Sequence, residues 1–179
     1  MQRSLVGSEM CIRDSLYTTG PYPLSYNGWG DVLVIVFFGF VPVGGTYYVQ
    51  ALTWTPDVTI ASLICGLLID TLLVVNNYRD READARSGKR TVIVRFGEKF
   101  GRYFYLMLGI TASLLCLCFL REGHFYAAFL PQLYLIPHFL TWKRMVKIYS
   151  GKKLNSILGE TSRNMLLMGI LIAIGMLIN

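Results

Sequence analysis

Charged residues are scarce in this chain of 179 residues: they make up 16% of it, whereas hydrophobic residues make up 54%. The mean hydropathy is +0.47. Soluble domains carry about 25% charged residues, so this composition excludes an ordinary soluble domain. A lipid bilayer is the solvent that such a chain requires.

Cysteine and histidine are also rare, with four and two residues respectively. Cys65, Cys116 and Cys118 lie in apolar stretches, where a thiol behaves as a small hydrophobic group, so no disulfide framework is indicated. Cys116 and Cys118 point to different faces of a helix, which disfavours a shared metal. His124 and His138 are isolated, and we expect them to have packing or interfacial roles.

Long apolar runs are what the chain does contain. A helix needs about 20 mostly apolar residues to cross a hydrocarbon core of roughly 30 Å. Five runs approach that length, and they predict an all-α integral membrane bundle. The predicted spans are Val32–Gln50, Val58–Asn77, Tyr103–Leu120, Phe125–Trp142 and Asn164–Ile178.

The positive charge is concentrated in two of the connections. Residues 78–102 and 143–163 hold fourteen of the seventeen Lys and Arg residues. Basic residues collect on the cytoplasmic side of a membrane, so both loops are predicted to be cytoplasmic. The net charge of +6 therefore reflects topology and attraction to anionic lipid, and it does not indicate a nucleic-acid partner.

The first fifteen residues do not fit the rest of the chain. Residues 1–15 are polar and lack the apolar core of a signal peptide. The string QRSLVGSEMCIRDS resembles translated sequencing-adapter read-through, so we expect this segment to be non-native. Tyr17–Pro21 is rich in turn residues, as at the exit from an earlier helix, and the chain is predicted to be truncated at its N-terminus.

A polar cluster follows the second predicted span. Asn76, Asp80 and Asp84 are spaced by four residues. If the helix continues beyond the membrane, the amide and the two carboxylates line one face. Mg²⁺ takes one or two carboxylates and completes its coordination with water and phosphate oxygens, so the cluster is a candidate Mg²⁺ site.

Cations follow this cluster directly, since Lys89 and Arg90 come after Gly88. They could hold the remaining oxygens of a diphosphate at the membrane surface. The competing interpretation is a solvated loop in which acidic and basic residues offset each other. Asn76 and Asn77 weigh against it, because amides at the end of an apolar span usually face the bundle interior or a wet cavity.

Asp70 lies inside the second predicted span. A charged carboxylate there costs about 2.5–3.5 kcal/mol on insertion scales, so Asp70 must be neutral, paired or directed into a cavity. Asp70, Asn77 and Asp84 are spaced by seven residues. Asp70 could contact a polar acceptor substrate or form a buried structural hydrogen bond.

Several motifs together resemble one enzyme family. The pattern Asn76-x-x-x-Asp80-x-x-x-Asp84, followed by Gly88–Thr91 and Val94–Gly97, is similar to the second aspartate-rich motif of the UbiA superfamily of intramembrane prenyltransferases. Three further segments resemble its 1,4-dihydroxy-2-naphthoate polyprenyltransferases: Leu16–Gly20, Trp29–Asp31 and Gly45–Gln50. The resemblance covers residues 16–179.

The resemblance implies nine helices and two aspartate-rich motifs facing each other across a cavity. The chain would supply the fifth to ninth helices and the second motif. Asp80 and Asp84 would be the catalytic residues that hold Mg²⁺ against a polyprenyl diphosphate, with Asn76 supporting the metal. Without the first motif, the chain alone is expected to be inactive.

Further substrate contacts follow from the same resemblance. Lys89 and Arg90 would contact phosphate, and Arg79, Asn77 and Tyr17 would bind substrate near them. Family members often carry a phosphate-binding lysine four residues after the tyrosine equivalent to Tyr17, where this chain has a proline. Some aromatic residues would line the cavity, and two first-span tyrosines are candidates: Tyr47 and Tyr48.

The implied reaction is prenylation of 1,4-dihydroxy-2-naphthoate with decarboxylation, giving demethylmenaquinone at a bacterial inner membrane. Other aromatic acceptors, such as 4-hydroxybenzoate or homogentisate, stay open. A CDP-alcohol transferase is disfavoured, because Ala85-Arg86 occurs without the Asp-Gly element of that pattern. A transporter or membrane-scaffold fragment is the non-enzymatic alternative, since Pro42 and its neighbouring glycines could break a helix.

Overall fold

The computed structural model describes residues 28–178, and every regular element in that range is a helix. The predicted all-α class is therefore confirmed. Element η3 is a π-helix, and η4 and η5 are 3₁₀ helices. In chain order the elements are α2 (Gly30–Val34), η3 (Ile35–Gly44), α3 (Gly45–Ala51), α4 (Pro56–Arg86), α5 (Val92–Leu115), η4 (Cys116–Glu122), α6 (Phe125–Phe129), η5 (Leu130–Tyr134), α7 (Leu135–Ile148) and α8 (Leu154–Ile178).

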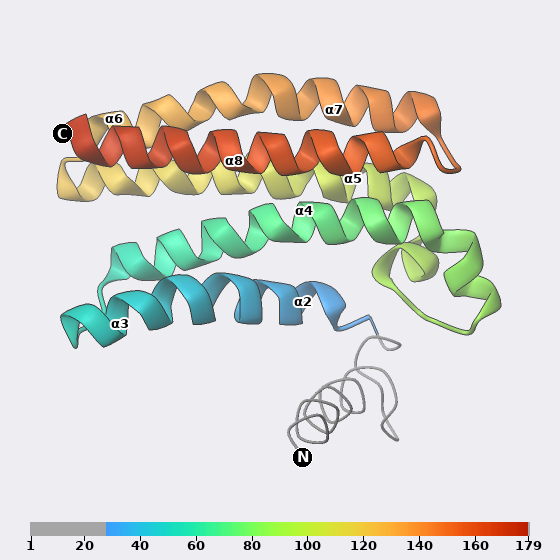
Figure 1. Ribbon diagram of the computed structural model, residues 1–179, viewed down its shortest axis with the longest axis horizontal. Helices are drawn as coiled ribbons and strands as arrows, with labels where there is room; N and C mark the ends of the chain where they lie inside the picture. The colour runs from blue at the N-terminus through green and yellow to red at the C-terminus, as the bar shows by residue number, and fades with distance from the viewer. Residues whose placement is uncertain (1–27, 179) are drawn as a thin grey trace, which may run out of the picture.

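The helices lie side by side along one long axis (Figure 1). Helix α4 occupies the middle and packs against η3, α5 and α8. The α4–α5 and α7–α8 connections lie at one end of the bundle, and the α3–α4 connection lies at the other (Figure 1). The two basic segments found in the sequence therefore meet at the same end.

Four helical stretches within residues 28–178 are long and apolar enough to cross a membrane: Gly30–Ala51, Pro56–Arg86, Val92–Glu122 and Leu154–Ile178. The sequence predicted five membrane-spanning helices. The predicted span Phe125–Trp142 is helical but is divided among α6, η5 and α7. Pro131 at the start of η5 has no N–H to donate, which accounts for a break in the α-helical pattern at that point.

The stretch Gly30–Ala51 is continuous despite its proline. Pro42 lies within η3, whose ten residues form a π-helix. A wider turn is one way to accommodate a residue that cannot donate the usual backbone hydrogen bond. The helix therefore changes from α to π geometry around Pro42 without a break. The discontinuous helix that suggested a transporter fragment is not observed between Gly30 and Ala51.

Helix α4 owes its sharp start to local sequence. The Thr55 hydroxyl accepts a hydrogen bond from the Val58 backbone N–H at 3.3 Å, and Pro56 occupies the first turn. Gly39 of η3 and Gly66 of α4 then allow the two helices to approach closely, since a Cβ at either position would collide with the backbone of the other helix. This contact brings the start of α2 beside the middle of α4.

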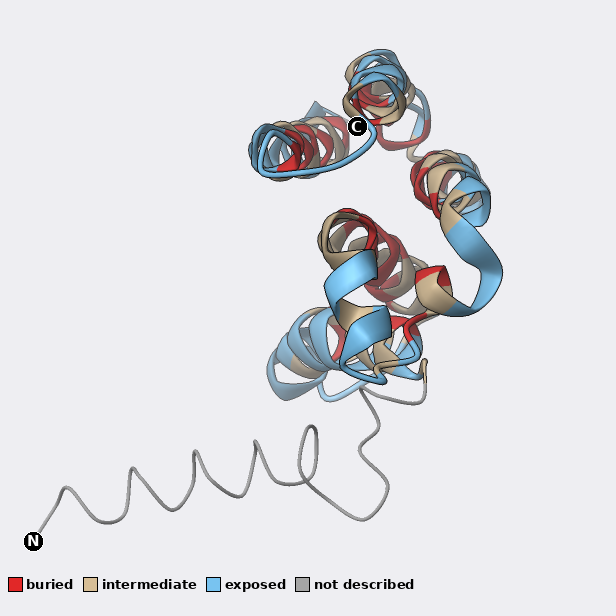
Figure 2. Cartoon of the chain, turned by 90° about the vertical axis from the view of Figure 1, so that its right-hand side faces the viewer, coloured by how far each residue is buried: buried red, intermediate tan, exposed pale blue. Residues whose placement is uncertain are grey.

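Hydrogen bonds and rings join the remaining helices. Tyr105 on α5 pairs with Thr161 on α8 at 3.0 Å, and His138 on α7 is buried and stacks on Tyr105 and Tyr134. The expected packing role of His138 is confirmed. Buried residues line the helix faces that are turned toward each other, and the outward faces are exposed (Figure 2).

Candidate functional site

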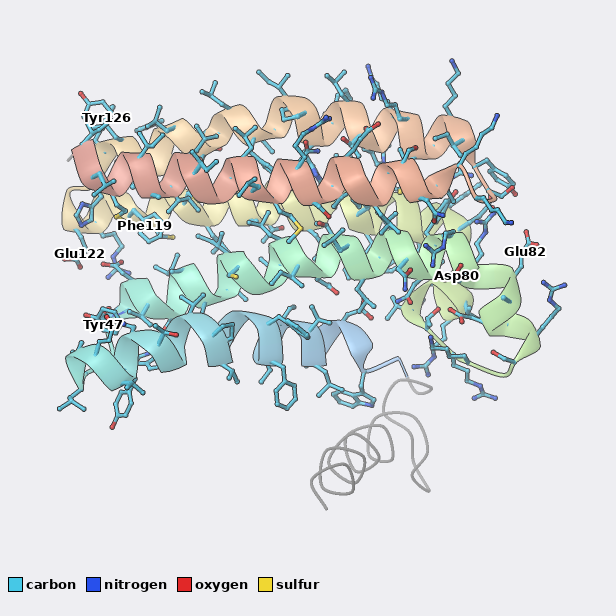
Figure 3. All side chains as sticks on the ribbon, viewed as in Figure 1. Tyr47, Asp80, Glu82, Phe119, Glu122 and Tyr126 are labelled. Carbon is cyan, nitrogen blue, oxygen red and sulfur yellow. The ribbon has the colours of Figure 1, made fainter. Side chains whose placement is uncertain are left out.

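The aspartate-rich segment is helical, as its spacing required. Helix α4 runs on to Arg86 and ends at Ser87, ahead of Gly88, whose φ of 76° suits glycine. Asn76, Asp80 and Asp84 therefore follow each other on successive turns of one regular helix. Figure 3 shows Asp80 at the end of the bundle where α4 meets the α4–α5 connection.

Arg79 links the first two of these residues. Its guanidinium donates to Asp80 Oδ1 at 2.8 Å, to Asp80 Oδ2 at 2.6 Å and to Asn76 Oδ1 at 2.6 Å. It also donates to Asn155 Oδ1, in the first turn of α8, at 2.8 Å. Three side chains from two helices thus direct their oxygens at one cationic group.

Asp84 has a different partner. Its Oδ1 lies 3.6 Å from Lys89 Nζ, and the Lys89 backbone N–H donates to the Asp84 carbonyl at 2.9 Å. Its Oδ2 is buried and has no hydrogen-bond partner among the described residues. A buried carboxylate oxygen without a partner is costly, so a ligand that bonded to it would relieve that cost.

The donor set suits a hard divalent cation. Asn76 Oδ1 and Asp80 Oδ2 already lie within 2.6 Å of one cationic nitrogen, and Asp84 Oδ2 is free to accept. No group of three or more His, Cys, Asp or Glu side chains is close enough to hold a metal anywhere in residues 28–178. Two carboxylates and an amide remain sufficient for Mg²⁺, which fills its other positions with water and phosphate.

A second cationic group, missed from the sequence, bonds to Tyr78, which precedes Arg79 on α4. Arg102 on α5 donates to the buried Tyr78 hydroxyl at 2.9 Å, and it bonds to Glu98 at 3.3 Å. Arg81 and Arg102 both lie against the Tyr149 ring, at 5.1 and 5.3 Å from its centroid. A hydrogen bond with the Glu98 carboxylate raises the pKa of Tyr149 above its ordinary value.

Asp70 lies deeper in α4 and is fully buried. It faces Asp31 in the first turn of α2, yet neither of its oxygens has a hydrogen-bond partner of good geometry among the described residues. Asp70 was expected to be neutral, paired or directed into a cavity, and its neighbour in the structure is a second carboxyl group. An acceptor contact for Asp70 stays a prediction.

The other predicted residues do not all lie at this end of the bundle. Asn77 is buried, Lys89 is half-buried and Arg90 is exposed. Tyr47 lies at the end of the bundle opposite Asp80 (Figure 3), and both Tyr47 and Tyr48 are exposed. Tyr17 and the suspected non-native residues 1–15 lie outside the described residues.

Asn155, like Arg102, was missed by sequence reasoning. It lies 76 residues after Arg79 along the chain, in a segment interpreted only as a basic loop. No spacing rule connects two residues so far apart. The only available signal was that both predicted cytoplasmic loops had to meet at one end of the bundle.

Comparison with known proteins identifies relatives over most of the chain. The model of the UbiA prenyltransferase family matches residues 10–176. The 1,4-dihydroxy-2-naphthoate octaprenyltransferase of Haemophilus influenzae is 36% identical over 166 residues, covering 90% of this chain and 53% of that protein. The enzyme of the same name from Escherichia coli is 40% identical over 113 residues, covering 63% of this chain and 36% of that protein.

A eukaryotic protein is also similar. The UbiA prenyltransferase domain-containing protein 1 of Dictyostelium discoideum is 29% identical over 163 residues, covering 91% of this chain and 48% of that protein. No solved structure matches the chain significantly. The chain spans about half the length of the curated relatives that it matches along most of its own length. With the family model covering nearly its whole length, the chain belongs to the UbiA prenyltransferase family.

Proposed function

We propose that the chain forms part of an enzyme that transfers a polyprenyl group from polyprenyl diphosphate to 1,4-dihydroxy-2-naphthoate. The observation that carries this proposal is the convergence of Asn76 and Asp80 oxygens on one cationic nitrogen at the end of an apolar helix. Such a group of oxygens, next to lipid, suits a substrate with a charged diphosphate head and an apolar tail.

Asp80, Asp84 and Asn76 are the residues that would hold Mg²⁺. Bound there, the metal would neutralise charge on the departing diphosphate. Lys89, which already lies near Asp84, and Arg90 in the same connection would contact phosphate oxygens. The allylic cation left behind would be attacked by the electron-rich carbon that bears the carboxylate, and carbon dioxide would leave to give the quinol, demethylmenaquinol, with diphosphate as the other product.

The acceptor assignment is supported by the names of the relatives. Bacterial relatives at 36% and 40% identity are named as 1,4-dihydroxy-2-naphthoate octaprenyltransferases. A relative from Synechocystis, at 28% identity, is named as a 2-carboxy-1,4-naphthoquinone phytyltransferase. Naphthalene-ring acceptors with a neighbouring carboxyl group are common to these names, which favours this acceptor over 4-hydroxybenzoate or homogentisate.

The site would face the cytoplasm of a bacterial cell. The chain is a multi-pass membrane protein, and both basic connections lie at the end that carries Asp80 (Figures 1 and 3). Basic residues collect on the cytoplasmic side, so this end is assigned to that side of the inner membrane. Diphosphate donors made in the cytoplasm would then reach the site directly.

The test compares two neighbouring acidic residues in the whole protein. Asp80→Asn removes the charge of a proposed metal ligand, whereas Glu82→Gln removes the same charge from an exposed position on α4. We expect Asp80→Asn to reduce Mg²⁺-dependent prenyl transfer at least about a hundredfold, a loss typical of removing a charge-stabilising group. We expect Glu82→Gln to retain turnover within about twofold. Unchanged turnover in Asp80→Asn would reject Asp80 as a metal ligand.

A further inference from the structure

Arg79 is held by more acceptors than an exposed arginine normally finds. Its guanidinium has four contacts of 2.6 to 2.8 Å with oxygens of Asn76, Asp80 and Asn155. Both oxygens of Asp80 are engaged in this way, and the side chain of Arg79 is only 25% exposed. The guanidinium thus fills the position where the oxygens of α4 converge.

A metal ion and this guanidinium cannot share those oxygens freely. A carboxylate that accepts a two-pronged arginine contact has used the lone pairs that point toward the cation. Nη2 of Arg79 lies 2.6 Å from both Asn76 Oδ1 and Asp80 Oδ2. A Mg²⁺ ion about 2.0–2.1 Å from both oxygens would overlap this nitrogen, so an ion held between Asn76 and Asp80 displaces the guanidinium from its present position.

Asn155 provides the second anchor for Arg79. It is exposed, belongs to the first turn of α8 and follows the short connection that contains Gly151 with a φ of 89°. Its Oδ1 reaches the other nitrogen, Nη1, while Nη2 faces Asn76 and Asp80. The guanidinium therefore bridges α4 and α8.

We propose that Arg79 is an exchangeable counter-ion of the aspartate-rich site: it occupies the cation position when metal and diphosphate are absent, and it passes to the diphosphate when they bind. Asn155 positions Arg79 in the first of these states. Arg79 is thus a positioning residue for Asp80 in one state and a phosphate contact in the other. The exchange keeps the charge at Asp80 balanced throughout.

This inference rests on the proposed function, because it needs metal and diphosphate to bind at Asp80. The experiment measures how tightly Mn²⁺ binds to the purified protein in detergent. Electron paramagnetic resonance reports the bound fraction of Mn²⁺. The measurement is made once with Mn²⁺ alone and once with added inorganic pyrophosphate. Neither reading depends on turnover, and circular dichroism verifies that each variant remains helical.

Arg79→Gln gives the main result. Without the competing guanidinium, we expect Mn²⁺ alone to bind about tenfold more tightly. This is the gain expected if Arg79 occupies the site in about nine-tenths of the unliganded molecules. With pyrophosphate we expect binding to weaken about tenfold, because a charge-assisted contact is lost. Arg86→Gln removes the same charge from an exposed position on α4 and controls for the general electrostatic effect.

Asn155→Ala tests the anchor without changing the charge. We expect it to tighten binding of Mn²⁺ alone about threefold, because Arg79 without its Asn155 contact would occupy the cation position in a smaller fraction of molecules. The matched control is Ser156→Ala, since the Ser156 hydroxyl donates to the nearby Lys153 carbonyl at 2.7 Å. That variant should bind Mn²⁺ as the unmodified protein does.

The outcomes separate the two claims. Opposite shifts for Arg79→Gln, absent in Arg86→Gln, support the exchange. A gain for Arg79→Gln that Arg86→Gln reproduces, or a shift in the same direction with and without pyrophosphate, overturns the exchange and leaves the metal site standing. If Mn²⁺ and pyrophosphate bind equally well to Asp80→Asn, the metal site itself is rejected, and with it the proposed function.

Discussion

At the scale of single residues, three aspartates of α4 have different environments. Asp80 is paired with Arg79, Asp84 with Lys89, and Asp70 faces another carboxyl group. The four-residue spacing identified Asn76, Asp80 and Asp84 correctly as neighbours on one helix face. It could not show that Arg79 folds back onto Asp80, because adjacent residues on a helix normally point in different directions.

The Asp31–Asp70 pair leads to a prediction about stability. Two carboxyl groups in an apolar interior satisfy each other best when a proton bridges them. Asp70→Asn retains a donor for Asp31, so its melting temperature in detergent should stay close to that of the unmodified protein. Asp70→Leu leaves Asp31 without this partner and should lower the free energy of unfolding by about 1–3 kcal/mol. Equal damage by both substitutions would show that the carboxyl groups do not pair.

At the scale of helices, hydropathy located the membrane-spanning segments better than it located helix ends. The predicted span Val58–Asn77 became α4, Pro56–Arg86, and the predicted span Asn164–Ile178 became α8, Leu154–Ile178. Polar residues mark where apolar surroundings end, but a helix continues into water as long as its backbone hydrogen bonds are satisfied. For this reason the predicted loop 143–163 concealed the start of α8, and Asn155 with it.

Close packing between η3 and α4 gives a prediction at this scale. A Cβ on Gly66 would meet the backbone of Ile35 at less than 3.0 Å, whereas a Cβ on Gly159 in α8 would meet nothing within 4 Å. Gly66→Ala should therefore destabilise the protein by about 1–3 kcal/mol through overpacking. Gly159→Ala should stabilise it slightly, because alanine favours helix by up to about 1 kcal/mol over glycine.

Thermal unfolding in detergent measures both glycine variants, with helix content followed by circular dichroism. The opposite signs matter more than the magnitudes, since both substitutions add the same methyl group to a helix. A melting temperature for Gly66→Ala at or above that of Gly159→Ala would contradict the close approach of η3 and α4. It would also remove the contact that brings Asp31 beside Asp70.

At the scale of the whole molecule, sequence alone was sufficient to predict the fold class, the family and the common end of the basic connections. These properties depend on composition, charge distribution and local motifs, which are all linear features of the chain. The division of the predicted span Phe125–Trp142 into α6, η5 and α7 was not predicted. The local signal was Pro131, which has no N–H to donate to an α-helix, but hydropathy alone does not register it.

The central claim concerns the reaction of the whole protein, and one measurement tests it most directly. The purified protein is incubated with polyprenyl diphosphate, Mg²⁺ and 1,4-dihydroxy-2-naphthoate labelled in its carboxyl group, and the product and released carbon dioxide are quantified together. We predict prenylated naphthoquinol and labelled carbon dioxide in equal amounts, both abolished by a chelator. Prenylation of 4-hydroxybenzoate with no reaction of the naphthoate, or a product that keeps its labelled carboxyl group, would contradict the proposed function.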